Sequence, residues 1–368
     1  MKKLAILLFL LVACAPVNEK IFVANEASGS ISVIDASSLK EIDRISLIAE
    51  HEDARVEYAP HNVQVVGDKV LITANIAHEE EEEHDMNEMN GEEHEMAAPE
   101  FKISTGIIAV EAHGEEETVH ADHPDQLIIM DAKSHKIIDR IDFNVGSHLA
   151  HVVSDGAYAY ATSTNEEVIF KVDLKTKAIS SIALPKGSMP HGIRLTADNK
   201  VAVIAAMGNA MLLLDFATKN ITSIALPGKG VQAGVVGNTA MVSVFDTKQL
   251  ALYDMNSGEL SFVDLPGAVG PIQIYWTADG KYVYVADQGV YFDQPAGRNT
   301  YKIDLTEKKV VATIDTGDAP HGVVVSPDNR VWVTNLNGNS VSVIENDKKV
   351  SEIPVGAAPN GISFWSLD

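Results

Sequence analysis

Short runs of residues that alternate between apolar and polar side chains recur along most of the chain. Residues 340–344 are a clear example, and turns rich in Gly, Asp and Asn separate such runs, as at 278–280 and 327–329. Alternation with a period of two, bounded by turn residues, is typical of antiparallel β-strands. No stretch shows the period of an amphipathic helix. The pattern therefore predicts an all-β fold.

The strands fall into a repeating unit of roughly 40 to 50 residues, a length typical of propeller blades. Each unit starts at a Pro-His or related turn and supplies four short strands. The seven starts lie at 59–62, 147–151, 189–192, 231–234, 270–273, 318–321 and 358–361. The repeats predict a seven-bladed β-propeller.

The two ends of the repeat region complement each other. Counting strands A to D outward from the axis, the first repeat begins with a B strand at 21–24, and the last, 361–365, is an A strand without a B. We therefore expect the N- and C-terminal strands to complete one blade, which closes the ring and leaves few free sheet edges.

The chain start resembles a bacterial lipoprotein signal. Lys2 and Lys3 precede an apolar run at 4–12, and Ala13 precedes Cys14, the single cysteine. Such a run is shorter than a membrane span and fits a signal peptide. We expect a signal peptide at 1–13, a lipidated tether at 14–19 that starts at Cys14, and a propeller at 20–368. The expected location is the bacterial cell envelope, in the periplasm or on the surface, with the lipid anchor as the sole membrane attachment.

The negative charge is concentrated in one segment. The net charge is -24, and residues 78–125, with fourteen Glu, three Asp and one Lys, carry -16 of it. A chain without a basic patch is not expected to bind nucleic acid. One cysteine also excludes an internal disulfide, a thiolate zinc site and a CxxCH haem attachment.

The acidic segment, an insertion at 76–125, holds six of the thirteen histidines. Imidazole and carboxylate groups bind Zn(II), and Cu(II) and Ni(II) accept the same ligands. Met86, Met89 and Met96 leave Cu(I) open. A solvated acidic linker is the alternative interpretation. The predicted metal ligands of the insertion are His78, His84, His94, His113, His120, Asp122 and His123.

A second set of histidines lies at the predicted hub. His61, His191 and His321 follow the turns that start innermost strands, and either His148 or His151 occupies the matching place in another blade. Gln232, Gln273 and Asn360 fit the remaining blades. D-to-A and B-to-C connections emerge on the same face of a propeller, so the insertion and these histidines should share that face. A connection at 50–57 could add ligands, whereas His135 belongs to the opposite face.

The last full repeat, with Pro320-His321-Gly322 at its start and the strand 331–335, is similar to the YVTN-type propeller repeat family. The hub histidines together with His113, His120, Asp122 and His123 also resemble the periplasmic zinc chaperone propellers that serve ABC-type zinc importers. That resemblance implies capture of zinc and its delivery to a substrate-binding protein of a metal importer.

Three other functions remain open from the sequence: a copper-binding propeller, a channel-mouth hydrolase or lactonase, and a surface scaffold for protein partners. The chain has no Gly-x-Ser-x-Gly elbow, the sharp turn that presents a serine nucleophile. We therefore expect metal binding without enzymatic activity.

Overall fold

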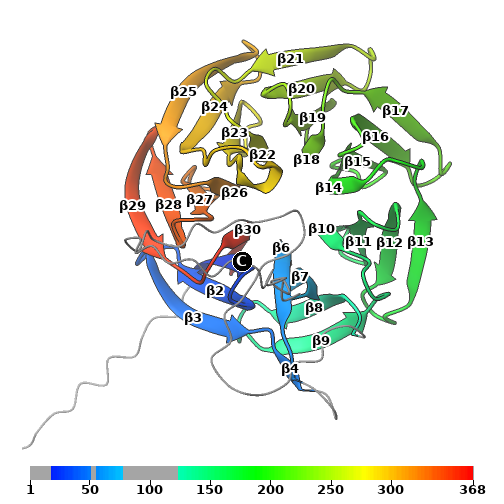
Figure 1. The fold of residues 1–368 in the computed structure, drawn as a ribbon, viewed down its shortest axis with the longest axis vertical. Coiled ribbons are helices and arrows are strands. Elements are labelled where there is room, and N and C mark those ends of the chain that lie inside the picture. Colours follow the sequence, from blue (N-terminus) through cyan, green and yellow to red (C-terminus); the bar gives the residue numbers. More distant parts are fainter. Residues whose placement is uncertain (1–17, 51–54, 78–122, 368) are drawn as a thin grey trace, which may run out of the picture.

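The protein is a ring of seven four-stranded antiparallel sheets around a central axis (Figure 1). A computed structural model describes residues 18–50, 55–77 and 123–367. Within these residues the sheets are the blades of a seven-bladed β-propeller, which confirms the fold predicted from the repeats.

Each blade runs from an innermost to an outermost strand. Blade 1 consists of β30 (Pro359–Ser366), β1 (Glu19–Asn25), β2 (Ser30–Asp35) and β3 (Lys40–Ser46). Blade 2 consists of β6 (Tyr58–Val66), β7 (Lys69–Ile76), β8 (Gln126–Asp131) and β9 (Ile137–Asp142). Blade 3 consists of β10 (Leu149–Ser154), β11 (Tyr158–Ser163), β12 (Val168–Asp173) and β13 (Ile179–Ala183). Blade 4 consists of β14 (Pro190–Leu195), β15 (Val201–Ala206), β16 (Ala210–Asp215) and β17 (Ile221–Ala225).

The remaining blades have the same order. Blade 5 consists of β18 (Gly230–Val236), β19 (Thr239–Val244), β20 (Gln249–Asp254) and β21 (Leu260–Asp264). Blade 6 consists of β22 (Pro271–Trp276), β23 (Tyr282–Asp287), β24 (Asn299–Asp304) and β25 (Lys309–Asp315). Blade 7 consists of β26 (Pro320–Val325), β27 (Val331–Asn335), β28 (Ser340–Glu345) and β29 (Lys348–Pro354).

The chain ends close the ring as the repeats predict. Strand β30, drawn in red, lies beside the blue strands of blade 1 (Figure 1). It pairs antiparallel with β1, with Lys20 opposite Trp365 and Phe22 opposite Ser363. Blade 1 therefore takes its innermost strand from the C-terminus and its other three strands from the N-terminal part.

The period-two pattern distributes apolar side chains to the two faces of each blade. In β7, Val70 and Ile72 pack with Phe22 in a cluster shared with blade 1. Leu71, between them, packs with Val152 in a cluster shared with blade 3. Because successive side chains of a strand point to opposite faces, the alternation seen in the sequence becomes a stack of hydrophobic layers between neighbouring blades.

Two small elements were not predicted. Strands β4 (Ala49–Glu50) and β5 (Arg55–Val56) form a two-stranded sheet in the connection from blade 1 to blade 2. A 3-10 helix, η1 (Val290–Phe292), lies in the connection between β23 and β24. In the part of the chain that the structure describes, no helix has the length and apolar character to cross a membrane.

The acidic insertion joins β7 to β8. Residues 78–122 lie outside the described residues, and with them His78, His84, His94, His113, His120 and Asp122. Residues 1–17, which include Cys14, lie outside them as well. At the base of the insertion the buried Asp125 accepts hydrogen bonds from the backbone N–H groups of Ile76 and His148.

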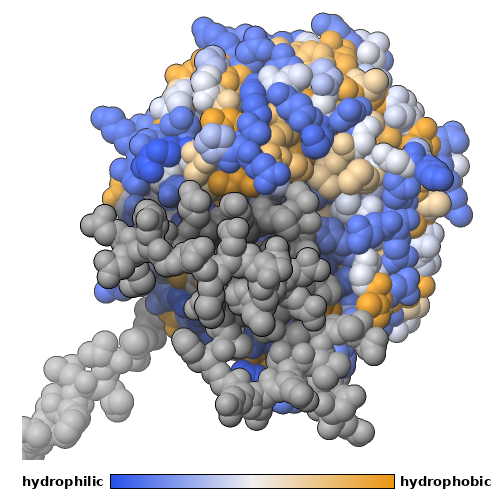
Figure 2. Space-filling view, in the orientation of Figure 1, coloured by the Kyte–Doolittle hydropathy of each residue, from blue (hydrophilic) through white to orange (hydrophobic). Residues whose placement is uncertain are grey.

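On the face seen in Figure 2, hydrophilic and hydrophobic residues are interspersed over the coloured surface. His135 belongs to the turn between β8 and β9, where its imidazole contacts Lys20 and Asp43. This turn joins the two outer strands of blade 2, and none of the hub histidines contacts it among the described residues.

Candidate metal centre

A β-bulge in the innermost strands determines which residues reach the hub. In blade 2, Pro60 pairs with Ala74 and Val63 pairs with Ile72, so that two residues of β6 lie opposite one residue of β7. In blades 3 to 7 the innermost strand has the same bulge, directly after the residue that corresponds to Pro60. Each of these strands therefore has two consecutive bulge positions.

The hub side chains divide between these two positions. The first bulge position holds His61, His191 and His321, and by the same spacing after the strand's first proline, Asn360. The second holds His151, Gln232 and Gln273. This register answers the question that the sequence left open: His151 belongs to the hub strand, and His148 precedes it in the turn, with φ 51°.

In blades 4 and 7 a glycine follows the histidine, because atoms of the next blade lie where a Cβ atom would be. A Cβ at Gly192 would lie 2.3 Å from Gln232 Oε1, and one at Gly322 would lie 2.2 Å from the carbonyl oxygen of Asn360. The glycine of the Pro-His-Gly sequence in blades 4 and 7 is therefore required by the packing of neighbouring blades. The Gln232 side chain of blade 5 fills the space beside Gly192, and the Asn360 carbonyl group of blade 1 fills the space beside Gly322.

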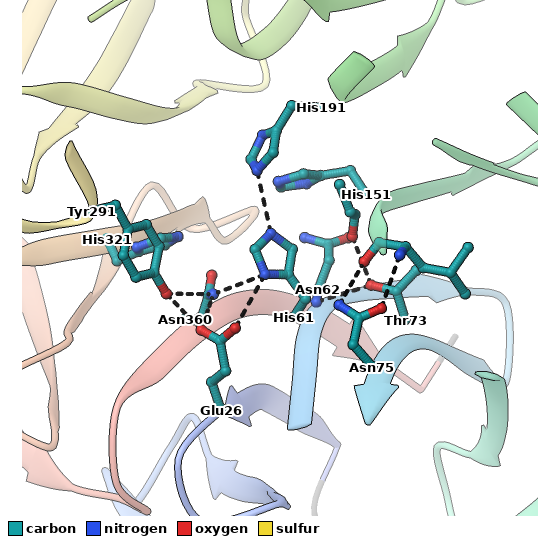
Figure 3. Close-up of polar contacts among 12 residues, drawn as sticks. Glu26, His61, Asn62, Thr73, Asn75, His151, His191, Tyr291, His321 and Asn360 are labelled. Atoms are coloured by element: carbon teal, nitrogen blue, oxygen red, sulfur yellow. Dashed lines mark hydrogen bonds and ion pairs between the residues drawn. The ribbon is translucent and has the colours of Figure 1, made fainter. Parts of the chain in front are cut away.

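Three histidines from blades 2, 3 and 4 converge at the hub. One ring nitrogen from each of His61, His151 and His191 lies within 4.8 Å of the other two (Figure 3). His61 is 6% exposed and His151 is fully buried. The ring of His61 stands edge-on to those of the other two, with centroids 5.7 Å and 5.4 Å away.

Hydrogen bonds fix which nitrogen of two of these rings carries hydrogen. His61 Nδ1 lies 3.3 Å from Glu26 Oε1, and His191 Nδ1 lies 2.9 Å from the carbonyl oxygen of Val231. Carboxylate and carbonyl oxygens only accept, so both Nδ1 atoms donate. In a neutral imidazole the Nε2 atom then carries no hydrogen and presents a lone pair.

The two Nε2 atoms face each other 3.3 Å apart. Two lone pairs repel at this distance unless a proton or a metal cation lies between them. Two nitrogens bound tetrahedrally to one zinc ion, each at about 2.0 to 2.1 Å, are separated by about 3.3 Å. The donor chemistry and the spacing therefore fit a transition metal held by His61 and His191.

Burial favours the neutral, metal-binding form of His191 and His151. Burial and the neighbouring His61 lower the pKa of His191 to about 3. Burial, His191 and His61 lower the pKa of His151 well below its usual value. The amide nitrogens of Gln232 and Gln273 lie 3.4 Å from His151 Nδ1 and 3.1 Å from His151 Nε2. Both amide nitrogens are donors, so the neutral ring accepts a hydrogen bond from one of them.

A buried carboxylate lies behind His61. Glu26 Oε2 accepts hydrogen bonds from Tyr291 Oη at 2.5 Å and from Asn360 Nδ2 at 2.7 Å. Burial alone would raise the pKa of Glu26, but the hydrogen bond from His61, together with these two donors, lowers it to about 2. A carboxylate–histidine pair of this kind orients a metal ligand and raises its basicity.

Sequence reasoning missed Glu26 and Tyr291. Glu26 follows β1 and Tyr291 belongs to η1, so both come from B-to-C connections, on the face where the innermost strands begin. The length of the connection from Asp287 to Asn299 was the available signal. Nothing local in the sequence indicates that Tyr291 reaches Glu26.

The other predicted ligands have different surroundings. The ring of His148 lies 6.1 Å from that of His61, and burial lowers the pKa of His148 to about 4. His321 is buried against Tyr291 and Gln288. Among the described residues, the group of converging ligand atoms includes neither of these histidines nor His123.

Fold and site together define a seven-bladed β-propeller with a buried histidine hub. No protein-family model matches the chain. It is 28% identical over 193 residues to Antigen Lp49 of Leptospira interrogans serogroup Icterohaemorrhagiae serovar copenhageni. That match covers 47% of the chain and 42% of the relative, less than half the length of each.

Solved structures show the same fold at low sequence identity. Virginiamycin B lyase of Staphylococcus aureus has a TM-score of 0.60 and 15% identity, over 83% of this chain and 91% of the lyase. A candidate 6-phosphogluconolactonase of Bacteroides fragilis has a TM-score of 0.60 and 13% identity, over 96% and 99% of the two chains.

These structures correct one prediction. The missing Gly-x-Ser-x-Gly elbow led us to expect no enzymatic activity, and that exclusion is wrong. The structural neighbours named above are described as enzymes, among them a lyase. The absence of the elbow therefore does not exclude enzymatic activity.

Proposed function

We propose that this chain is a metal-binding propeller that holds a divalent transition metal, zinc first, at His61, His151 and His191, and passes it to a partner. One observation carries the proposal. The Nε2 atoms of His61 and His191 face each other 3.3 Å apart, and an oxygen acceptor lies at the Nδ1 atom of each ring.

The proposed site has three protein ligands, which supports uptake and release of the metal. Zinc sites with three protein ligands keep a position for a further, exchangeable ligand. His148 stands beside His61 with a ring that has no side-chain hydrogen bond among the described residues. A metal arriving at the hub can thus meet His148 before all three buried histidines bind it. Copper and nickel, which accept the same nitrogen ligands, compete with zinc.

The acidic insertion is proposed to collect the metal. Its histidines and carboxylates raise the local cation concentration, and the chain enters and leaves it at β7 and β8 of blade 2. Asp125 binds the backbone of His148 at its base, which connects it to the hub. The proposed recipient is a substrate-binding protein of a metal importer, met at a lipid anchor on Cys14 in the bacterial envelope.

The test is zinc stoichiometry and affinity of protein purified without residues 1–17, measured by competition with a chromophoric chelator. Four proteins are compared: wild type, the triple variant His61→Ala/His151→Ala/His191→Ala, a deletion of residues 78–122, and His135→Ala as control. The deletion spares Asp125 because that carboxylate supports β7 and the turn before β10.

We expect one tight zinc ion in the wild type, the deletion and the control, and its loss in the triple variant. The deletion should lose only weaker ions. Equal zinc binding by the wild type and the triple variant rules out the hub as a metal site, and unchanged stoichiometry in the deletion rules out the insertion as a collector.

A further inference from the structure

Within the described part of the chain, His321 presents an N–H group without an acceptor. Gln288 Oε1 accepts the backbone N–H of Tyr291 at 3.1 Å, so Gln288 Nε2 is the donor in its 3.0 Å contact with His321 Nδ1. The hydrogen of the neutral His321 ring is therefore on Nε2. His321 is 2% exposed, and Nε2 has no hydrogen-bond partner among the described residues.

Asn360 presents the complementary group. Its Nδ2 donates to the Glu26 carboxylate at 2.7 Å and to Tyr291 Oη at 3.0 Å, which uses both amide hydrogens and fixes the amide orientation. Asn360 is fully buried, and its Oδ1 atom lacks a hydrogen-bond partner in the described part of the chain. Burial of an unpaired acceptor is as costly as burial of an unpaired donor.

The two unpaired atoms belong to side chains from neighbouring innermost strands. His321 and Asn360 hold the first bulge position of the adjacent innermost strands β26 and β30. Both contact Tyr291: the His321 ring lies edge-on at 4.9 Å, and Asn360 is hydrogen-bonded to its hydroxyl. Asn360 Nδ2 also lies 3.5 Å from His61 Nδ1 (Figure 3).

The hydrogen-bonding character of the pair selects its ligand. An anion would satisfy His321 but would face Asn360 Oδ1 and the Glu26 carboxylate. A cation would satisfy only Asn360. A neutral O–H group accepts from one and donates to the other, as water does when it bridges buried polar groups.

We infer that His321 and Asn360 form a binding subsite for a neutral hydroxyl ligand, water or an alcohol, next to the hub metal. His321 is thus a hydrogen-bond donor to that ligand rather than a metal ligand. The position beside the metal rests on the proposed function, whereas the subsite itself does not, because neither His321 nor Asn360 belongs to the group of converging metal ligands.

The test is a pair of crystal structures of the wild type, metal-free and zinc-loaded, each soaked in methanol or in sodium formate at equal concentration. We expect an oxygen atom within hydrogen-bond distance of both His321 Nε2 and Asn360 Oδ1, replaced by methanol and not by formate. An empty position, bound formate or a His321–zinc bond overturns the inference.

Two variants give a readout in solution. His321→Phe removes the hydrogen-bond donor and keeps a ring of similar volume. We expect this variant to raise the zinc Kd by no more than about tenfold, the lower end of the effect of a residue next to a metal ligand. We also expect its crystal structure to lack the bound oxygen atom. His321→Gln, which can accept from Gln288 and donate to the ligand, should restore both. A loss of zinc affinity above a hundredfold in His321→Phe would mark a direct ligand. If wild type binds no hub zinc, the proposed function fails while the metal-free structures still decide the subsite.

Discussion

His61 Nε2 and His191 Nε2 face each other at 3.3 Å, although each belongs to a ring whose Nδ1 is committed to an oxygen acceptor. The gap between them can hold a proton or a metal ion, but not both. Zinc binding at the hub should therefore compete with protons.

Glu26→Gln should weaken zinc binding at the hub by about 10- to 100-fold. The substitution keeps the size of the side chain but removes the charge that supports His61 Nδ1–H, and the new amide nitrogen cannot accept from Tyr291. Chelator competition on the purified variant measures the change. Glu307→Gln, in an exposed turn, is the control and should bind zinc as the wild type does. An unchanged Kd in Glu26→Gln would mean that Glu26 does not act through His61.

The metal-free protein should lose stability as the pH falls below about 6.5, the ordinary pKa of histidine. Burial holds the folded-state pKa of His191 and of His321 at about 3. Between these values the unfolded chain binds more protons than the folded one, so each such histidine destabilises the fold by about 1.4 kcal/mol for every unit that the pH falls.

Urea unfolding between pH 7 and pH 5 measures this dependence. His321→Gln, which removes one of the depressed groups, should show a shallower loss of unfolding free energy than the wild type. Parallel curves for the two proteins would contradict a neutral, buried His321.

The sequence predicted what depends on local pattern. Alternation and turn residues produce strands, and the Pro-His turns placed His61 and His191 at the start of innermost strands. His151 could not be chosen over His148, because the choice depends on a bulge that appears only when β10 pairs with β11. Tyr291 and Glu26 were missed because they meet through the closed ring, 265 positions apart in the chain.

His321 shows a further limit of sequence reasoning. It shares its turn with His61 and His191, so a sequence pattern treats the three alike. Their roles diverge through the group that contacts Nδ1: an oxygen acceptor at His61 and His191, and the amide donor of Gln288 at His321. Those partners come from other blades or connections.

Lys20→Met should destabilise the protein by about 1 to 3 kcal/mol, the cost of leaving buried acceptors unpaired. Lys20 is 5% exposed, and its Nζ donates to the carbonyl oxygens of Ala132 and Lys133, both at 3.0 Å, so it ties blade 1 to blade 2. Methionine keeps the apolar stem and removes the donor. Urea unfolding at pH 7 measures the change, with the exposed Lys40→Met as control. Equal losses of unfolding free energy in both variants would show that the hydrogen bonds from Lys20 to blade 2 do not stabilise the protein.

Gly192→Ala should impair both folding and the hub. The new Cβ would lie 2.3 Å from Gln232 Oε1 and 2.6 Å from Gln232 Cα, and because Cα belongs to the backbone, a side-chain rotation cannot relieve the overlap. We expect a loss of about 1 to 3 kcal/mol in unfolding free energy, as for other overpacked sites.

Zinc affinity should fall in the same variant, because Gln232 is one of the two amides that contact His151. The control is Gly338→Ala, where a Cβ would approach Asn335 Cβ and Ser340 Oγ at 3.2 Å in an exposed turn. It should cost less stability and leave the zinc Kd unchanged. If Gly192→Ala were destabilised but bound zinc with wild-type affinity, the contact between Gln232 and His151 would not matter for the metal, and the hub would depend on His61 and His191 alone.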